Sequence, residues 1–357
     1  MKYLLKMIPN RVRRNYMGGA GIDWLHGQEH GTDGDRPEEW VASMVAAKNP
    51  GMEEIAGEGY ASCLLNGQKV LMKDLVAASP EFYFGREHME RRGADPGFLF
   101  KILDSSMRLH VQAHPTADFS KARLDSPYGK LECYYIIHVR DGVEPYIRLG
   151  FQHAPDRGEW KRIIEEQDIR AMDACFEKIP VKEGQVWFIP GGMPHAIGEG
   201  ILMLEIMEPS DWVVRCEFER EGVNVPPEAR FMGRGLDFCL DVFDYTQYSV
   251  EEIERKSRLE PYVIQKGENY CLEQLADSRI TSCFEVKRLR IDCGNTVMDG
   301  GRLMAGVVTR GSLTLRCGEE TEALKRGDSV MIAASAETIE VVVDSESGAE
   351  ICFVNPA

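Results

Sequence analysis

Residues 184–198, GQVWFIPGGMPHAIG, combine an apolar strand, a turn rich in glycine and proline, and a histidine. The side chains of residues 185–189 are largely β-branched or aromatic, which favours a strand. Pro190, Gly191 and Gly192 favour a turn. The stretch therefore predicts a strand and a turn, with His195 following directly after the turn.

A second stretch, RLHVQAHP at residues 108–115, alternates polar and apolar side chains with the period of a strand. The polar positions of this stretch carry Arg, His, Gln and His, whereas a solvent-facing strand would favour Lys, Glu and Thr. The composition of this polar face is therefore unusual. Because Gln112 and His114 are two residues apart, they should project to the same face. Met107, Leu109, Val111 and Ala113 are expected on one face, and Arg108, His110, Gln112 and His114 on the other.

The rest of the chain is mostly strand and turn. Apolar residues recur at helical spacing in residues 159–177, which predicts a small helical insertion near 155–178. A composition change at residues 245–260 suggests a linker, so we expect two domains, 1–255 and 256–357. Many short strands with frequent turns point to β-barrels or sandwiches. Strands are predicted at residues 98–114 (with a turn at 104–106), 131–139, 201–207 and 213–218, a hairpin at 306–315 and a tight turn at 325–328.

Composition and charge exclude several classes of partner. The chain has 357 residues, 43% of them hydrophobic, and a formal net charge of −16. Nucleic acid and anionic membranes need a basic surface, so neither is expected as a partner. No apolar run approaches a membrane span, and the N-terminus is not a convincing signal peptide. Ten cysteines without a CxxC pair favour reduced thiols, which predicts a cytoplasmic protein.

Four residues suggest one divalent metal site. An amide, a carboxylate and two imidazoles suit zinc or another first-row divalent ion. A single histidine is more often a satisfied polar residue than a ligand, but the combination favours ligation. Three or four protein ligands would leave a position for water or a sugar oxygen. The candidate ligands are Gln112, His114, Glu132 and His195.

These segments resemble a known family. The spacing of Gly184, Pro190, Gly192 and His195 resembles the second signature of the cupin barrels. The element Gln112-x-His114-Pro115, with Glu132 further on, is similar to the first signature of the type I phosphomannose isomerases. The resemblance is strong over residues 98–218, weaker over 1–97 and only architectural over 260–357. Other matching segments are FKILD at 100–104, IPGGMPHAI at 189–197 and SDWVVR at 210–215.

The resemblance implies a mostly β protein with double cupin (jelly-roll) barrels. It implies an intramolecular oxidoreductase that interconverts mannose 6-phosphate and fructose 6-phosphate through an enediolate. By matched position, Gln112, His114, Glu132 and His195 would bind one Zn²⁺ per chain, or another divalent first-row metal. The expected partner is a small sugar phosphate, and both a monomer and a homodimer stay open.

Further residues are candidates for proton transfer and sugar binding. Arg215 suits an enediolate or phosphate oxygen, although a structural salt bridge with Glu205 or Glu217 is the alternative. Glu205 could carry the proton if burial raises its pKa; otherwise it orients other groups. Lys130 is a candidate for substrate binding or proton transfer, against the plainer interpretation of a solvated turn lysine. Asp211 is expected to bind substrate, to orient Arg215 or to cap a turn.

His110 is the main departure from the family pattern, because these isomerases commonly have a small serine there. It would crowd the pocket, offer another metal ligand or replace a phosphate contact. A second hypothesis is therefore an isomerase or epimerase of a different sugar, with or without a phosphate. A third is a non-catalytic sugar-binding cupin, against which Glu205, Arg215 and Lys130 argue.

Overall fold

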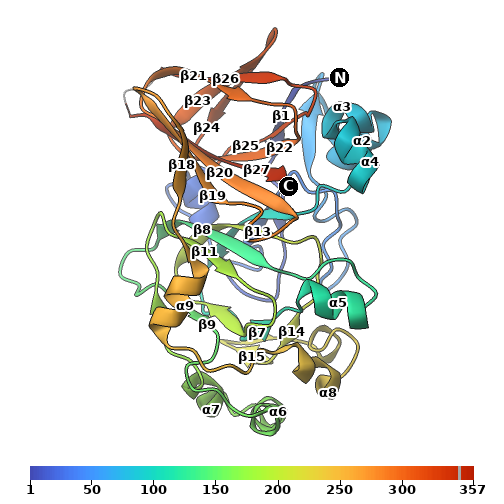
Figure 1. The fold of residues 1–357 in the computed structure, drawn as a ribbon, viewed down its shortest axis with the longest axis vertical. Helices are drawn as coiled ribbons and strands as arrows, with labels where there is room; N and C mark the ends of the chain where they lie inside the picture. Colours follow the sequence, from blue (N-terminus) through green and yellow to red (C-terminus); the bar gives the residue numbers. More distant parts are fainter. Residues whose placement is uncertain (345–346) are drawn as a thin grey trace.

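The computed structural model describes residues 1–344 and 347–357, which form two antiparallel β-barrels stacked along the long axis of the molecule (Figure 1). Each barrel is built from two facing sheets, so four sheets follow one another along the long axis. The order is a five-stranded, a seven-stranded, a nine-stranded and a four-stranded sheet. The predicted fold class, mostly β with double cupin barrels and a small helical insertion, is confirmed.

The first barrel closes around the seven-stranded and five-stranded sheets. Apolar side chains from both sheets, including Tyr134, Trp187, Leu149 and Ile197, form the core between them. The seven-stranded sheet has the order β17 (Arg258–Leu259), β11 (Val186–Ile189), β8 (Glu132–Val139), β13 (Ile201–Met207), β6 (Leu99–Ser105), β3 (Glu38–Val41) and β2 (Arg11–Val12). The five-stranded sheet has the order β10 (Ile179–Pro180), β9 (Tyr146–Leu149), β12 (His195–Ile197), β7 (Gln112–Ala113) and β14 (Val214–Arg215).

The second barrel is made by the other two sheets, which enclose a separate apolar core. The nine-stranded sheet has the order β18 (Tyr262–Lys266), β19 (Tyr270–Ala276), β20 (Phe284–Ile291), β27 (Ala349–Pro356), β22 (Met304–Arg310), β25 (Ser329–Ile332), β1 (Leu4–Ile8), β4 (Ser62–Leu65) and β5 (Gln68–Leu71). The four-stranded sheet has the order β21 (Gly294–Asp299), β26 (Thr338–Val343), β23 (Ser312–Cys317) and β24 (Glu320–Lys325). A short ribbon pairs β15 (Glu219–Arg220) with β16 (Val223–Asn224).

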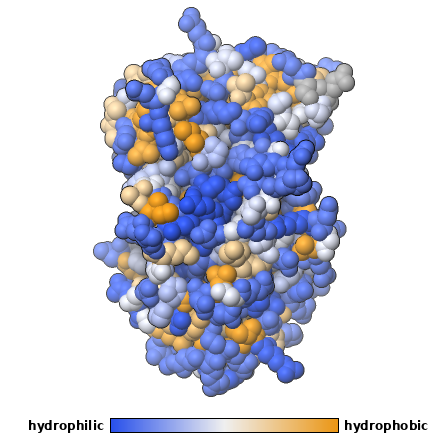
Figure 2. Space-filling model, turned by 180° about the vertical axis from the view of Figure 1, so that it is seen from behind, coloured by the Kyte–Doolittle hydropathy of each residue, from blue (hydrophilic) through white to orange (hydrophobic). Residues whose placement is uncertain are grey.

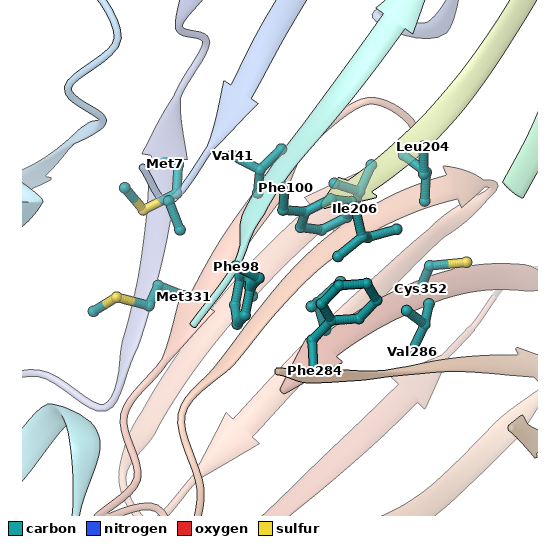
Figure 3. Packing of buried hydrophobic residues seen from close by; sticks show 14 of the residues in the cluster. Met7, Val41, Phe98, Phe100, Leu204, Ile206, Phe284, Val286, Met331 and Cys352 are labelled. Carbon is teal, nitrogen blue, oxygen red and sulfur yellow. The ribbon is translucent and has the colours of Figure 1, made fainter. Parts of the chain in front are cut away.

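A shared apolar layer joins the two barrels, because the seven-stranded and nine-stranded sheets pack face to face. Phe100 and Ile206 from the first barrel lie opposite Phe284 and Val286 from the second (Figure 3). Alternation along each strand explains how one sheet serves two cores. On β8, Cys133 and Tyr135 face the second barrel, while Tyr134 faces the interior of the first.

Helices cover the outer faces and ends. The helical insertion near 155–178 is confirmed, but it is two helices, since Gln167 takes a left-handed conformation with φ 51° and Asp168 caps the second helix. These two helices lie at the end of the first barrel far from the second (Figure 1). The helices are α1 (Ala20–Leu25), α2 (Met72–Ala78), α3 (Pro80–Phe84), α4 (Arg86–Arg92), α5 (Ala117–Arg123), α6 (Arg157–Glu166), α7 (Ile169–Ala174), α8 (Leu236–Cys239) and α9 (Val250–Ser257), with 3-10 turns at Pro227–Ala229 and Leu240–Val242.

The hairpin predicted at 306–315 is wrong. β22 and β23 are consecutive, but they belong to different sheets and do not pair with each other. Gly311, with φ 71°, lies at the corner where the chain crosses between the sheets. The turn predicted at 104–106 begins later, because β6 continues to Ser105. The tight turn at 325–328 is confirmed by a hydrogen bond from the Asp328 amide to the Lys325 carbonyl.

The face pattern predicted for residues 107–113 is wrong in part. Met107 and Leu109 pack inside the first barrel, whereas Val111 and Ala113 pack against the helices outside it. The regular pairing of β7 covers only Gln112–Ala113, so the chain before it is free to change faces. The relation between Gln112 and His114 is unaffected by this change.

The chain crosses the division predicted near residue 255 in both directions. β1 pairs with β25 of the second barrel, and β17 pairs with β11 of the first. The N-terminal strand and the C-terminal part of the chain therefore build one sheet together. The two-domain division stays a prediction, and the shared core argues that the barrels stabilise each other.

The surface carries few large apolar side chains. The face shown in Figure 2 is mostly hydrophilic, with apolar residues in small separate groups. Within the described residues, none of the helices has the length and apolar character that crossing a membrane would require. All ten cysteines are free, and eight of them are buried.

Candidate metal centre and active site

The candidate site lies inside the first barrel, between its two sheets. Its wall is unusually polar for a barrel interior, and most of its charged side chains are buried. Buried charges are rare unless they are paired or bind a ligand, so this cavity is a candidate functional site. The polar side chains that line it are Arg14, Asn15, Tyr16, Glu38, Lys101, His110, Gln112, Lys130, Glu132, Tyr134, Glu205 and Arg215.

The four predicted metal ligands converge beside this cavity, and two of them, Gln112 and Glu132, line it. The ligand atoms of His114, Glu132 and His195 all lie within 4.8 Å of one another, and all three residues are buried. Gln112 pairs directly with His195 between β7 and β12, and its side-chain Nε2 lies 3.4 Å from His195 Nε2. Strand pairing thus brings together residues that are far apart in the sequence.

Both imidazole rings are oriented by backbone carbonyls. His114 Nδ1 lies 2.9 Å from the Trp212 carbonyl oxygen, and His195 Nδ1 lies 3.0 Å from that of Met193. Each Nδ1 therefore donates its proton to a carbonyl, and each Nε2 keeps a lone pair. Burial lowers the pKa of His195, and burial lowers that of His114 to about 3, so both rings are neutral. A neutral imidazole fixed in this way is the form that binds metals.

The carboxylate of Glu132 lies between the two rings. Its Oε1 lies 3.0 Å from His114 Nε2, and its Oε2 lies 3.6 Å from His195 Nε2. Burial acts to raise the pKa of Glu132, but its polar and charged neighbours, among them the Lys130 ammonium, outweigh it and hold the pKa well below its usual value. Tyr134 donates a hydrogen bond to Oε2, and this bond holds the carboxylate in its orientation.

These donors fit a divalent cation. Glu132 Oε1 is buried and accepts no hydrogen bond of good geometry, although Lys130 Nζ lies 3.2 Å away. Lone pairs of His114 and His195 face the same carboxylate, an arrangement that a cation would stabilise. Two nitrogens, a carboxylate oxygen and an amide oxygen are a donor set typical of zinc and other first-row divalent ions.

A second group of charges lies further along the cavity. Lys101 Nζ lies 3.3 Å from Glu205 Oε2 and 3.7 Å from Glu38 Oε1, and all three residues are buried. Burial raises the pKa of Glu205 to about 7, although Lys101 opposes the rise. Glu38 is the opposite case, with a pKa of about 2, because Lys101 and Arg14 outweigh the effect of burial. Two carboxylates in one cavity thus have well-separated pKa values, which is typical of an acid–base site.

The other predicted site residues are placed as follows. Lys130 Nζ lies 3.4 Å from His114 Nε2, so Lys130 is part of the buried cluster and the interpretation as a solvated turn lysine is wrong. Arg215 lines the cavity and donates to the Ala229 carbonyl at 2.7 Å. His110 lines the cavity as well, with Nε2 3.1 Å from the Val223 carbonyl oxygen. Asp211 is exposed and borders an adjoining groove instead.

His110 is separate from the candidate metal ligands. Among the described residues, the group that could hold a metal consists of His114, Glu132 and His195, without His110. Burial lowers the pKa of His110 to about 4, so its ring is neutral at physiological pH. The idea that His110 offers an alternative ligand is therefore not supported by its position.

Sequence reasoning missed six polar residues of the cavity wall, namely Arg14, Asn15, Tyr16, Glu38, Lys101 and Tyr134. Two of them carried a signal. Lys101 stands inside the apolar strand LFKILDS, and Glu38 precedes Trp40 in a fully buried strand. A charge within an apolar strand must be paired inside the protein, which marks both as site candidates. Arg14 and Tyr16 lie in an irregular segment, where no periodicity indicates their direction.

The fold and the buried donor cluster define a two-barrel cupin with a candidate metal centre in its first barrel. Comparison with known proteins narrows this class, although no family model matches the chain. The chain is 37% identical over 134 residues to a Bacillus subtilis protein named probable mannose-6-phosphate isomerase, and 34% identical over 174 residues to mannose-6-phosphate isomerase of Streptococcus mutans. The chain spans about half the length of these curated relatives, 41% and 53%.

Longer matches agree with these. A second Bacillus subtilis relative, named mannose-6-phosphate isomerase, is 26% identical over 274 residues, which cover 75% of this chain and 80% of the relative. The crystal structure of the mannose 6-phosphate isomerase from Bacillus subtilis superposes with a TM-score of 0.73 at 17% identity, covering 99% of each chain. A structure titled as the holo, zinc-bound mannose 6-phosphate isomerase gives a TM-score of 0.72 at 15% identity, over 99% of this chain and all of that one. The predicted resemblance to the type I phosphomannose isomerases is confirmed.

Proposed function

We propose that this protein is a metal-dependent aldose–ketose isomerase that interconverts mannose 6-phosphate and fructose 6-phosphate through an enediolate. The observation that carries the proposal is the cavity itself. It joins a donor cluster for one divalent cation, His114, Glu132 and His195, to a buried carboxylate with a pKa of about 7, Glu205. Relatives named as mannose-6-phosphate isomerases support the choice of sugar.

Gln112, His114, Glu132 and His195 are proposed to hold one Zn²⁺ per chain, or another first-row divalent ion. When bound, such an ion would polarise the sugar carbonyl and stabilise negative charge on the neighbouring oxygens. Backbone carbonyls and Tyr134 orient the proposed ligands, so the donors would be held before the substrate arrives.

Glu205 is proposed to move the proton between C1 and C2. A general base works best when its pKa is close to the working pH, and burial brings Glu205 to about 7. Lys101, at 3.3 Å, holds the carboxylate in place and stabilises its charged form. Lys130, beside Glu132, is proposed to stabilise the sugar oxygens on the same side of the cavity.

The charge of the cavity favours a phosphorylated sugar over a free one. Four cationic side chains line it, against three carboxylates. A bound divalent cation would bring this local charge to about three positive, inside a chain whose net charge is −16. A neutral sugar would leave this excess in place, whereas a sugar phosphate dianion would offset most of it. His110 is proposed to contact the sugar as a neutral ring, and Asp211 to act on the substrate from the groove that it borders.

We propose that the enzyme acts in the cytoplasm on a small sugar phosphate, as a monomer or a homodimer. The free, mostly buried cysteines are compatible with a reducing compartment.

The test is to incubate the zinc-loaded protein with mannose 6-phosphate in D₂O and follow the mixture by NMR. Formation of fructose 6-phosphate, with deuterium entering C2 of mannose 6-phosphate, is the expected result. A panel of mannose, glucose 6-phosphate and other free and phosphorylated sugars serves as the control. Turnover of a free sugar in preference to mannose 6-phosphate would reject the proposed substrate, and no turnover of any sugar would reject an isomerase.

A further inference from the structure

We propose that Arg14 recognises the substrate, and that its guanidinium, together with that of Arg215, forms a binding site for the phosphate group. This inference rests on the proposed function only in taking the anion to be a phosphate monoester. It concerns a residue outside the strands that carry the metal ligands and the proton carrier. Arg14 belongs to the N-terminal segment between β2 and α1.

Arg14 is buried against the cavity without full satisfaction of its guanidinium. Its exposed fraction is 8%, and it lines the same cavity as Gln112 and Glu132. One nitrogen donates to the side chain of Asn49 at 3.3 Å. Its Nε is buried and makes no hydrogen bond, although Glu38 Oε1 lies 3.4 Å away. A buried guanidinium with donors to spare is a costly feature unless a ligand uses it.

Glu38 does not satisfy all the donors of Arg14, because several other groups share this carboxylate. Tyr16 donates to one oxygen of Glu38 and Trp40 to the other, each at 2.7 Å. Lys101 lies 3.7 Å from the same oxygen as Arg14. Glu38 is thus shared between Arg14 and Lys101, and its two oxygens do not use all the donors of the Arg14 guanidinium.

Arg215 supplies the second guanidinium. Its guanidinium donates to a neutral acceptor, the Ala229 carbonyl, and no acid forms an ion pair with it among the described residues. Burial, and next the charge of Arg14, lower the pKa of Arg215 to about 10. The two arginines therefore repel each other across the cavity. The carboxylate of Asp211 acts in the opposite sense on both, but its side chain is exposed and borders the adjoining groove.

The other polar groups of the cavity are engaged elsewhere. Lys130 lies 3.2 Å from Glu132, and Lys101 lies 3.3 Å from Glu205. His110 is neutral and directs Nε2 to the Val223 carbonyl. Arg14 and Arg215 are thus the cations whose guanidinium donors are not all used within the protein, and these donors can meet a dianion. The guanidinium fork suits phosphate oxygens, since each can donate two parallel hydrogen bonds.

The experiment measures binding of inorganic phosphate to the full-length protein in its metal-loaded form by isothermal titration calorimetry. The variants are Arg14→Gln, which removes the charge, and Arg14→Lys, which keeps the charge and the pairing with Glu38 but lacks the fork. Arg13→Gln is the matched control, because Arg13 is adjacent in sequence but pairs with Glu58 outside the cavity. Loss of a charged hydrogen-bonding partner is expected to weaken phosphate binding roughly 10- to 100-fold in Arg14→Gln.

Arg14→Lys should lie between that variant and the wild type, and Arg13→Gln should match the wild type. Phosphate binding within twofold of the wild type in folded Arg14→Gln or Arg14→Lys overturns the inference. A wild-type protein that binds no phosphate overturns it as well, whatever the variants do. If Arg14 only supported Glu38, Arg14→Gln would lower thermal stability without changing the affinity for phosphate.

Kinetics with mannose 6-phosphate give a second measurement. Arg14→Gln should raise KM by a larger factor than it lowers kcat, because the phosphate is bound equally in the ground and transition states. The two proposals fail separately. A protein that binds phosphate through Arg14 and does not turn over mannose 6-phosphate keeps this inference and rejects the proposed function. If the wild type isomerises mannose 6-phosphate and Arg14→Gln has an unchanged KM, the proposed function is kept and this inference is rejected.

Discussion

Lys101 and Glu205 face each other on neighbouring strands, with Nζ and Oε2 3.3 Å apart inside the first barrel. They are direct partners in the register between β6 and β13. Burial raises the pKa of Glu205 to about 7, and the ammonium of Lys101 keeps it from rising further. The pair therefore sets the protonation of the proposed proton carrier.

This relation predicts a pH dependence of activity. Glu205 must be deprotonated to accept a proton, so kcat/KM should fall as the pH drops below about 7. In Lys101→Met the positive charge is lost, the pKa of Glu205 rises, and the acidic limb of the profile should move to higher pH. The measurement is a pH–rate profile of both proteins for mannose 6-phosphate. An acidic limb at the same pH in both would argue against Glu205 as the titrating group.

Glu205→Gln provides the matching loss of function. It keeps the shape of the side chain but cannot accept a proton, so kcat should fall by roughly 10²- to 10⁴-fold. Metal content should stay at the wild-type value, because Glu205 is outside the donor cluster. Retention of full activity would show that another group carries the proton.

Tyr134 should act on the metal through Glu132. Its hydroxyl donates to Glu132 Oε2 and holds the carboxylate in place. Tyr134→Phe is expected to weaken zinc affinity by about 10- to 100-fold while leaving the fold intact. Competition with a chelating dye measures the affinity. Tyr262→Phe, whose hydroxyl bonds to Asp277 at the surface, is the control and should bind zinc normally. Equal affinity in both variants would mean that Tyr134 has no part in the site.

The shared apolar layer predicts that the two barrels unfold together. Phe284 of the second barrel is fully buried against the first. Phe284→Ala should lower the free energy of unfolding by about 3–5 kcal/mol. Val297→Ala, at a position that is 55% exposed, should change it by less than about 0.5 kcal/mol. Urea unfolding followed by tryptophan fluorescence, which reports the first barrel, should shift in the first variant. If the fluorescence-detected unfolding midpoint of Phe284→Ala equalled that of the wild type, the two barrels would unfold independently.

His195 should be needed for both metal and turnover. In His195→Ala one imidazole of the donor cluster is lost, so metal retention and isomerisation should both fall to background. His153→Ala is the control, since that imidazole is 66% exposed and lies outside the cluster. Elemental analysis and activity are measured on the same samples. An active His195→Ala protein would rule out this residue as a ligand.

Much of the metal centre could be predicted because its residues lie on short, regular strands. Period two placed Gln112 with His114, and the turn before His195 marked its position. Lys101 and Glu38 were not predicted as site residues, because their meeting with Glu205 depends on how β6 pairs with β3 and β13. Pairing between distant strands is a property of the whole sheet, which local alternation does not encode.

The second barrel shows the same limit. Residues 306–315 have the alternation and the glycine of a hairpin, but the chain turns a corner at Gly311 and joins a different sheet. A tight hairpin and a corner have similar local sequences. The difference lies in which apolar faces meet across the barrel, and those faces come from strands as far apart as β1 and β27.

The most direct test of the central claim is the metal dependence of mannose 6-phosphate isomerisation. The purified protein is assayed as prepared, after removal of metal with a chelator, and after return of zinc, with the metal content measured at each step. The account predicts that activity disappears with the metal and returns as the content approaches about one ion per chain. Full isomerase activity in a protein shown to be metal-free, or none in a fully loaded protein, would contradict it.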